Sequence, residues 1–247
     1  MKKLIKTYLP GLVIVVIAGW IIRQEYEALD YFYQWRKPTA IENPFFVAMA
    51  TWGIRFLLLS LLMSPIYAFT GWRFPLKLRK PLGLVAFGFV SIHVYIYLTA
   101  KRAFDCLAII NQMPSQYECP ETYGLMELLF RPSFVIFGTI AFLILALMAA
   151  TSIKPTMKLM GRFWKPLHRL VYVAAISIMV HIIVAASSGK RAFVGGEEAL
   201  SEYQLYLVAL VVLLVVRVPI IKHSLQRVIP FAPNPRKAKP KNTVLAS

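Results

Sequence analysis

Three of the four histidines lie within or at the ends of long apolar stretches. His93 lies in the apolar run at 81–100 and His181 in the run at 170–189, which His168 shortly precedes. His223 lies in a polar C-terminal segment, where we expect a solvated ring. An imidazole among apolar groups costs free energy unless it finds a partner, and neutral imidazole is a common metal ligand. The three histidines are therefore candidate ligands. The alternative is a histidine that is hydrogen-bonded to a carbonyl group of a neighbouring helix.

These histidines are positioned by apolar stretches that are long enough to cross a membrane. The 247-residue chain is 58% hydrophobic and 16% charged, which is outside the range of an ordinary water-soluble domain. A helix needs roughly 20 apolar residues to cross a hydrocarbon core of about 30 Å. The sequence predicts an all-α, polytopic membrane bundle of about six transmembrane helices, at residues 7–22, 45–70, 81–100, 132–153, 170–189 and 203–216.

The basic residues are distributed unevenly between the two sides of the predicted bundle. With the N-terminus in the cytoplasm, 19 of the 28 Lys and Arg residues fall on the cytoplasmic side and all 11 Asp and Glu residues fall outside. Because basic residues favour the cytoplasmic side, this pattern predicts that both termini are cytoplasmic. The net charge of +17 is then explained by topology and not by nucleic-acid binding. Residues 1–229 are expected to form one membrane domain, and residues 230–247 a basic, disordered cytoplasmic tail.

His93 and His181 are expected at a similar depth. His93 lies 13 residues beyond Lys80, and His181 lies 15 residues beyond Pro166. At about 1.5 Å per residue, each is roughly 20 Å from the cytoplasmic edge, in the outer half of the membrane. Two imidazoles at one height on different helices are the axial ligands that one haem iron requires. The pair therefore predicts a b-type haem site.

His168 lies near the cytoplasmic edge, where it could ligate a second haem. It precedes His181 by 13 residues, about 3.6 turns, which separates the two side chains by roughly 140° on an ideal helix. An irregularity near Pro166 or a helix tilt is needed to bring both to one side. Arg79 and Lys80 stand at the matching height of the other helix, so a second haem would have an unusual or missing axial ligand.

Arg55 is a charged residue inside the second expected span. It lies ten residues beyond Phe45, at a depth close to that expected for His93 and His181. A buried guanidinium offers paired donors that match the carboxylate of a haem propionate. The alternatives are snorkelling of the side chain toward the interface and hydrogen bonds to backbone carbonyls.

Two further features concern processing and redox state. The N-terminal lysines Lys2, Lys3 and Lys6 precede an apolar run, as in a secretion signal, but no small-residue cleavage site follows, so we expect an uncleaved anchor. Cys106 and Cys119 lie in one expected external connection, residues 101–131. A disulfide and two free thiols are both compatible with this arrangement.

Four segments in a fixed order resemble a known family. They are GIRFLLLSLLMSP at 53–65, LRKPLGLVAFGFVSIHVYIYL at 78–98, RPSFVIFGTIAFLILALMAATS at 131–152 and MGRFWKPLHRLVYVAAISIMVHI at 160–182. Together they resemble the MsrQ (formerly YedZ) family, the haem-binding membrane subunits of the bacterial periplasmic methionine-sulfoxide reductase system, within the ferric-reductase-like transmembrane group. The resemblance covers residues 50–220.

The resemblance implies an electron-transfer subunit of an oxidoreductase system in the bacterial inner membrane, with no catalytic domain of its own. Such a subunit takes electrons from the quinone pool or a cytosolic flavin reductase and delivers them to a periplasmic molybdopterin enzyme that repairs oxidised envelope proteins. It implies haem b, either one or two, and FMN. The positions that match the family's haem ligands are His93, His168 and His181, and the matching basic positions are Arg55 and Arg79.

Other functions are compatible with parts of the sequence. Arg55 and the histidines could form a relay in a small proton-coupled transporter, although the sequence shows no internal symmetry of the kind that transporters have. A purely structural anchor for a partner would leave three membrane histidines unexplained. The long connection at 101–131 and the basic tail leave open a different periplasmic acceptor. The sequence shows no FAD or NADPH domain, which argues against a self-contained ferric reductase.

Overall fold

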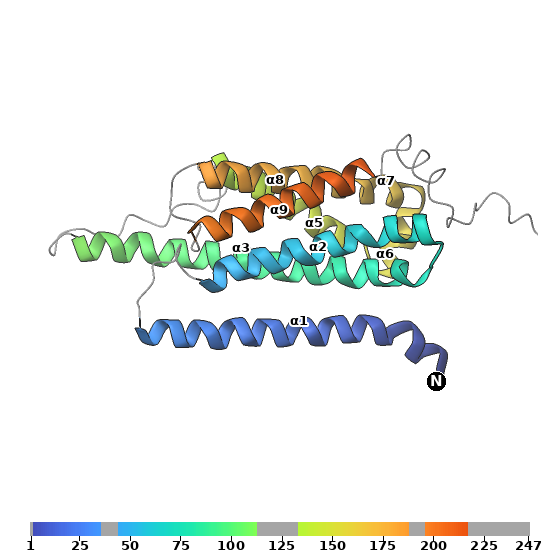
Figure 1. Cartoon of the computed structure of the whole chain (residues 1–247), viewed down its shortest axis with the longest axis horizontal. Coiled ribbons are helices and arrows are strands. Elements are labelled where there is room, and N and C mark those ends of the chain that lie inside the picture. Colours follow the sequence, from blue (N-terminus) through green and yellow to red (C-terminus); the bar gives the residue numbers. More distant parts are fainter. Residues whose placement is uncertain (1, 36–43, 113–132, 188–195, 217–247) are drawn as a thin grey trace, which may run out of the picture.

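The computed structural model describes residues 2–35, 44–112, 133–187 and 196–216, most of which are helical (Figure 1). The long helices are α1 (Lys2–Trp35), α2 (Pro44–Thr70), α3 (Phe74–Gln112), α5 (Ser133–Ala150), α8 (Val171–Ser187) and α9 (Gly196–Val215), and the short ones are α6 (Lys154–Met160), η2 (Gly161–Phe163) and α7 (Trp164–Arg169). No strand occurs among these residues. The predicted all-α fold is confirmed.

Each of the six expected spans coincides largely with helix. Four segments of the described chain are long and apolar enough to cross a membrane, and two further apolar helices are shorter. The four are Tyr8–Ala28, Phe45–Thr70, Phe74–Thr99 and Lys154–Ala185, and the shorter two cover Val135–Ala150 and Tyr203–Val215. The chain is therefore a multi-pass membrane protein.

Two helices, α1 and α3, continue well past the C-terminal ends of their expected spans. The prediction of a connection from residue 101 is wrong in its first part, because α3 continues as helix to Gln112, and α1 similarly continues to Trp35. Neither extension contains a glycine or a proline, so local propensity allows the helix to continue outside the apolar run. The structure does not describe Cys119, His223 or the tail at 230–247, nor the side chain of Cys106.

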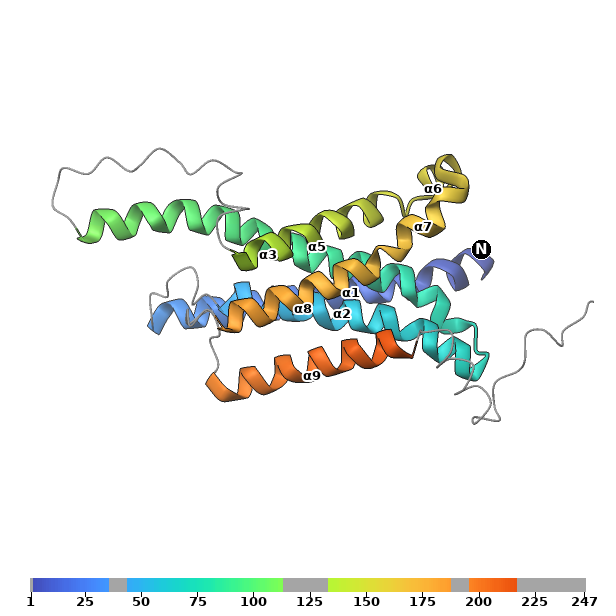
Figure 2. The same cartoon turned by 90° about the horizontal axis from the view of Figure 1, so that it is seen from above.

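The helices pack as two pairs with two flanking helices. α2 lies along α3, α5 lies along α8, and contacts between α3 and α5 join the pairs. α1 lies against α2 and α3, and α9 lies against α2 and α8 (Figure 1). Figure 2 shows α5 and α9 toward opposite edges of the bundle. The two pairs carry the candidate histidines on α3 and on α7–α8.

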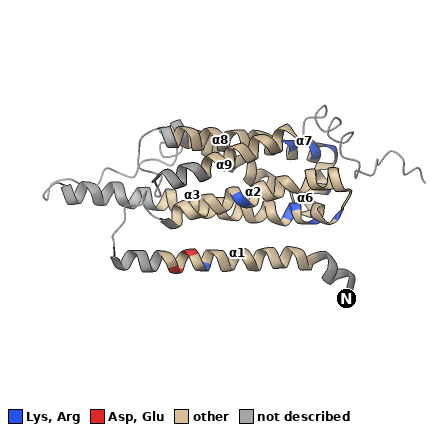
Figure 3. Cartoon of the chain, in the orientation of Figure 1, with Lys and Arg blue, Asp and Glu red and all other residues tan. Residues whose placement is uncertain are grey.

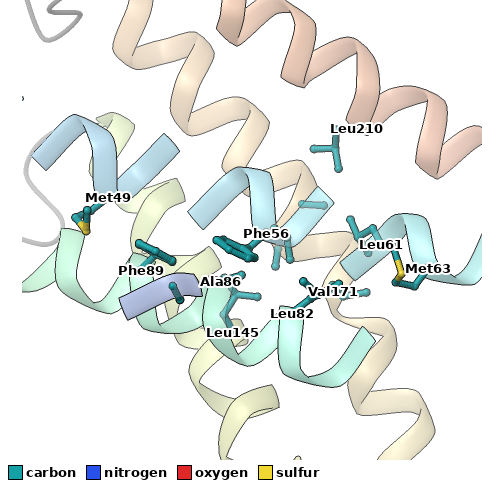
Figure 4. Close-up of a cluster of buried hydrophobic side chains, with 14 of the residues drawn as sticks. Met49, Phe56, Leu61, Met63, Leu82, Ala86, Phe89, Leu145, Val171 and Leu210 are labelled. Carbon is teal, nitrogen blue, oxygen red and sulfur yellow. The ribbon is translucent and has the colours of Figure 1, made fainter. Parts of the chain in front are cut away.

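The centre of the bundle is a cluster of apolar side chains between the helix pairs (Figure 4). Phe56 of α2 and Phe89 of α3 stack with ring centroids 5.4 Å apart, and Phe89 is 1% exposed. The other labelled members are Met49, Leu61, Met63, Leu82, Ala86, Leu145, Val171 and Leu210. Because lipid tails are as apolar as these side chains, close packing supplies the stabilisation that water exclusion supplies in soluble proteins.

Basic residues gather at one end of the bundle, where α6, α7 and the start of α3 lie (Figure 3). We call this region the basic end; it comprises Arg73, Lys77, Arg79, Lys80, Lys154, Lys158, Arg162, Lys165 and Arg169. Trp72 and Phe74 stack beside it, with ring centroids 5.4 Å apart. Basic and aromatic residues together are typical of the cytoplasmic membrane interface.

Gly53 brings α2 and α3 close together. A Cβ atom at this position would lie 2.8 Å from Val90 Cγ2 and 3.6 Å from the carbonyl oxygen of Ala86. A Cβ atom at Gly19, in the middle of α1, would meet nothing within 4 Å. The two glycines therefore separate the effect of helix contact from the effect of helix propensity.

Replacing Gly53 with valine should lower the free energy of unfolding by about 1–3 kcal/mol, because the added side chain overpacks the α2–α3 contact. Thermal unfolding in detergent micelles measures the change. Gly19→Val is the matched control, since it changes propensity equally without a clash. An equal loss in both variants would contradict the packing role of Gly53.

Candidate functional site

His93 is held by the first turn of the neighbouring helix α2. Its Nδ1 lies 3.0 Å from the carbonyl oxygen of Phe46, and its ring stacks on the Phe46 ring with centroids 4.1 Å apart and planes at 22°. A carbonyl oxygen only accepts, so Nδ1 of the neutral ring carries the proton and donates. The Nε2 atom then presents a lone pair. Metal-ligating histidines usually have this second hydrogen bond.

His181 rests against a glycine of α5. A Cβ atom added to Gly138 would lie 3.0 Å from His181 Nδ1, 3.1 Å from Cε1 and 3.5 Å from Cγ. These three ring atoms are centred on Nδ1, so the Nδ1 side of the ring faces the α5 backbone. The Nε2 atom lies on the other side of the ring. His93 and His181 are thus both supported on their Nδ1 side by the helix that pairs with their own.

The structure brings His93 and His181 together at one height. Their rings are near enough to interact electrostatically. Stacking of Phe87 on Phe142, with centroids 5.8 Å apart, sets the relative height of α3 and α5. His93 lies six residues beyond Phe87 on α3, a rise of about 9 Å. Gly138, which contacts His181, lies four residues from Phe142 on α5 toward the same end of the bundle, a rise of about 6 Å. We call this height the histidine level.

His168 lies on α7, at the basic end. Its Nε2 is 3.4 Å from the hydroxyl of Thr151, and its ring packs on Trp164 with centroids 4.4 Å apart. Trp164 in turn donates from its indole nitrogen to the carbonyl oxygen of Thr151, at 3.2 Å. Arg79 of α3 lies within electrostatic range of the imidazole. His168 therefore belongs to a second site that is separate from the histidine level.

The irregularity required between His168 and His181 is present. α7 ends at Arg169 and α8 begins at Val171, and the backbone nitrogen of Leu170 bonds to the carbonyl of Leu167 at 2.9 Å, a tighter turn than an α-helix makes. The break lies four residues after Pro166, which occupies the first turn of α7 where its missing N–H is tolerated. The ideal-helix angle of about 140° therefore does not apply to this pair.

The second site lies about 20 Å along the helices from the histidine level. Arg79 precedes His93 by 14 residues, and Lys80 of α3 donates to the carbonyl oxygen of Ser152 just beyond α5. The Ser60 hydroxyl donates to the Arg79 carbonyl at 2.8 Å, and one turn further the Ser64 hydroxyl oxygen is buried with no hydrogen-bond partner. The second site thus has one imidazole, one guanidinium and an unsatisfied hydroxyl nearby.

Arg55 makes contacts with aromatic side chains of two helices. Its Nε donates to the Tyr206 hydroxyl of α9 at 2.6 Å, and its guanidinium carbon lies 4.5 Å from the centre of the Trp52 ring. The Trp52 indole donates to Glu25 of α1 at 2.9 Å. This polar group, which we call the Arg55 cluster, links α1, α2 and α9.

The depth of Arg55 differs from the expectation. Phe46 marks the histidine level on α2, and Arg55 follows it by nine residues, about 13 Å further toward the basic end. Arg55 therefore lies between the histidine level and the second site. The difference arises because the first turn of α2, at Phe46, lies beside His93 in the middle of α3, and residue counts in one helix do not reveal this register.

Sequence reasoning missed the residues that support the histidines. Phe46 acts through its backbone carbonyl, which no side-chain pattern reveals, and Thr151 lies in what reads as the end of an apolar run. Gly138 carries a weak signal, since it is the one glycine in α5. Among the described side chains, no group of three or more His, Cys, Asp or Glu residues could hold a metal ion by itself.

The bundle is that of a multi-pass membrane protein, with imidazoles on two of its helices at one level. The family described as ferric reductase like transmembrane component matches residues 48–179. This match covers more than half of the chain, so the chain belongs to that family. Arg55, Arg79, His93 and His168 lie inside the matched range, and His181 lies two residues beyond it.

Individual proteins similar to this chain share one name. The chain is 31% identical over 140 residues to the protein-methionine-sulfoxide reductase heme-binding subunit MsrQ of Brucella anthropi, covering 57% of this chain and 56% of that protein. It is 32% identical over 136 residues to the MsrQ of Azospira oryzae, covering 55% and 52%. The chain thus matches little more than half the length of these relatives. The resemblance predicted from the sequence is confirmed.

Replacing Tyr206 with phenylalanine should destabilise the bundle by about 1–2 kcal/mol, because the Arg55 guanidinium loses a hydrogen-bond acceptor in an apolar environment. Thermal unfolding in micelles measures this loss. Tyr95→Phe is the control, since Tyr95 is 67% exposed. If both variants melt together with the unchanged protein, the Arg55–Tyr206 bond does not stabilise the fold.

Proposed function

We propose that this chain is a transmembrane electron-transfer subunit that holds b-type haem, with His93 and His181 as axial ligands. The observation that carries the proposal is the pair of imidazoles at one level, each supported on its Nδ1 side by a neighbouring helix. Two ligands at one height from two helices suit haem iron. The MsrQ relatives are named as heme-binding subunits, which supports the same cofactor.

The residues at the histidine level fit a haem ligand set. The Phe46 carbonyl fixes the tautomer of His93 and orients its ring, which keeps Nε2 unprotonated for ligation. The stacked Phe46 ring limits rotation of the imidazole. Nearby apolar side chains, including Phe89 and Met49, exclude water from the bundle centre. Haem, when bound, supplies reversible one-electron chemistry at its iron.

At the second site, we propose that His168 ligates a second haem. The Trp164 ring and the Thr151 hydroxyl hold its imidazole, and no described histidine stands opposite it on α3. Arg79 matches an anionic group there, either a haem propionate or the phosphate of FMN. Arg55, between the two levels, supplies a positive charge that matches a propionate.

The direction of electron flow follows from the charge distribution and the relatives. The basic end is assigned to the cytoplasm of a bacterial inner membrane. Electrons are proposed to enter from the quinone pool or a cytosolic flavin reductase and to leave at the opposite face. The acceptor is proposed to be a periplasmic, molybdopterin-containing methionine-sulfoxide reductase. The similar proteins are named as subunits of a protein-methionine-sulfoxide reductase, which supports the methionine-sulfoxide part of this proposal.

Substitution of the histidines tests the ligand assignment. His93→Ala and His181→Ala should each abolish the low-spin haem spectrum of the histidine level, because one axial ligand is lost, whereas His168→Ala should leave that signal intact. Absorption and electron paramagnetic resonance of the purified protein measure this. His223→Ala, outside the predicted spans, is the control.

Two outcomes would overturn the proposal. One is the absence of any haem spectrum in the unchanged protein after expression with sufficient haem. The other is equal retention of the signal in all three bundle variants, which would show that the imidazoles are not ligands.

A further inference from the structure

We propose that Gly138 is a positioning residue for His181, and that its missing side chain is what allows the imidazole to present Nε2 to the haem iron. The inference rests on the proposed function, since it assumes that His181 is an axial ligand. It assigns a role to a residue of α5, a helix that carries no ligand.

The geometry singles out Gly138. The three atoms that an added Cβ would meet first all belong to the His181 ring, at 3.0, 3.1 and 3.5 Å. The contacts to Nδ1 and Cε1 are tighter than most real Cβ contacts, so the ring would have to move away from α5 by a few tenths of an ångström. Other described glycines meet different groups: Gly53 meets Val90, Gly83 meets the Ser60 hydroxyl, and Gly88 meets nothing within 4 Å.

A glycine in the middle of α5 needs an explanation. Glycine is less favourable than alanine inside a helix, because more backbone freedom is lost when it is ordered. The rest of α5 is rich in Ala, Leu, Ile and Phe, which are compatible with helix in a bundle. Where helices only need a small residue in order to pack closely, alanine is sufficient, as at Ala174 and Ala175 of α8, which are fully buried. The position of the His181 ring supplies the explanation.

The contact also fits the arrangement of the other histidine. The His93 ring has its Nδ1 side against the Phe46 carbonyl of α2, and the His181 ring has its Nδ1 side against Gly138 of α5. In each case the support comes from the helix that packs most closely against the ligand's own helix. A shift of the His181 ring away from α5 would change its approach to the iron and weaken that axial bond.

Gly138→Val tests the role of this position. We expect roughly 10–100-fold weaker haem binding, as is typical when a supporting partner of a metal ligand is lost. We also expect conversion of the low-spin signal to high spin, and carbon monoxide binding by the reduced protein. Gly138→Ala should show the same changes to a smaller degree. Gly88→Val is the matched control, since it places the same side chain in α3 five residues from His93 with no atom to displace.

A double substitution distinguishes positioning from general damage. In a His181→Ala background, Gly138→Val should cause no further loss of haem affinity, because the ring through which it acts is gone. Circular dichroism and elution volume of each variant report on folding, and Gly138→Ala, which favours helix, keeps the test valid if the valine variant does not fold.

Three results would overturn the inference. If Gly138→Val had the same spectrum and carbon monoxide reactivity as the control Gly88→Val, the position of the His181 ring would not depend on this glycine. An unchanged spectrum and affinity in Gly138→Ala, if the valine variant does not fold, would show the same. Further loss in the double variant would show that Gly138 acts through other groups. A haem-free wild-type protein would instead reject the proposed function, so the two failures can be told apart.

Discussion

An imidazole inside a membrane bundle must find a polar partner, and helical backbone has few groups to offer. Helix formation already uses the N–H groups, but each carbonyl oxygen has a second lone pair. His93 uses this second lone pair at Phe46, in the first turn of α2. The bond requires α2 and α3 to be aligned so that Phe46 and His93 meet. The close packing of these helices at Gly53 is what permits that alignment.

The need to pair polar groups also explains the contacts at the basic end. The last carbonyls of a helix have no partner within it, and α5 ends at Ala150, at the basic end. Trp164 donates to the Thr151 carbonyl and Lys80 donates to the Ser152 carbonyl, so α7 and α3 both attach to the end of α5. A lysine that reads as a topology signal therefore also has a structural contact. His168 is placed by this attachment, because its ring packs between Trp164 and Thr151.

Much of the fold could be predicted because membrane helices must be apolar over a known length. The number of spans, the all-α class and the similar height of His93 and His181 follow from run lengths and residue counts. The end of α3 at Gln112 could not be predicted in this way, because outside the apolar run only helix propensity determines where a helix stops. The depth of Arg55 and the supports at Phe46 and Gly138 depend on the register between helices, which a single sequence does not contain.

Arg55 shows how a charge is accommodated without reaching the interface. Its contacts include the face of Trp52 and the hydroxyl of Tyr206, groups that are themselves compatible with lipid. Aromatic faces attract a cation and avoid the desolvation cost of a buried carboxylate partner. Through these contacts α2 binds the flanking helices α1 and α9, while its first turn supports His93 and Ser60 holds the Arg79 carbonyl. α2, which carries no histidine itself, therefore determines the position of α3 at both levels.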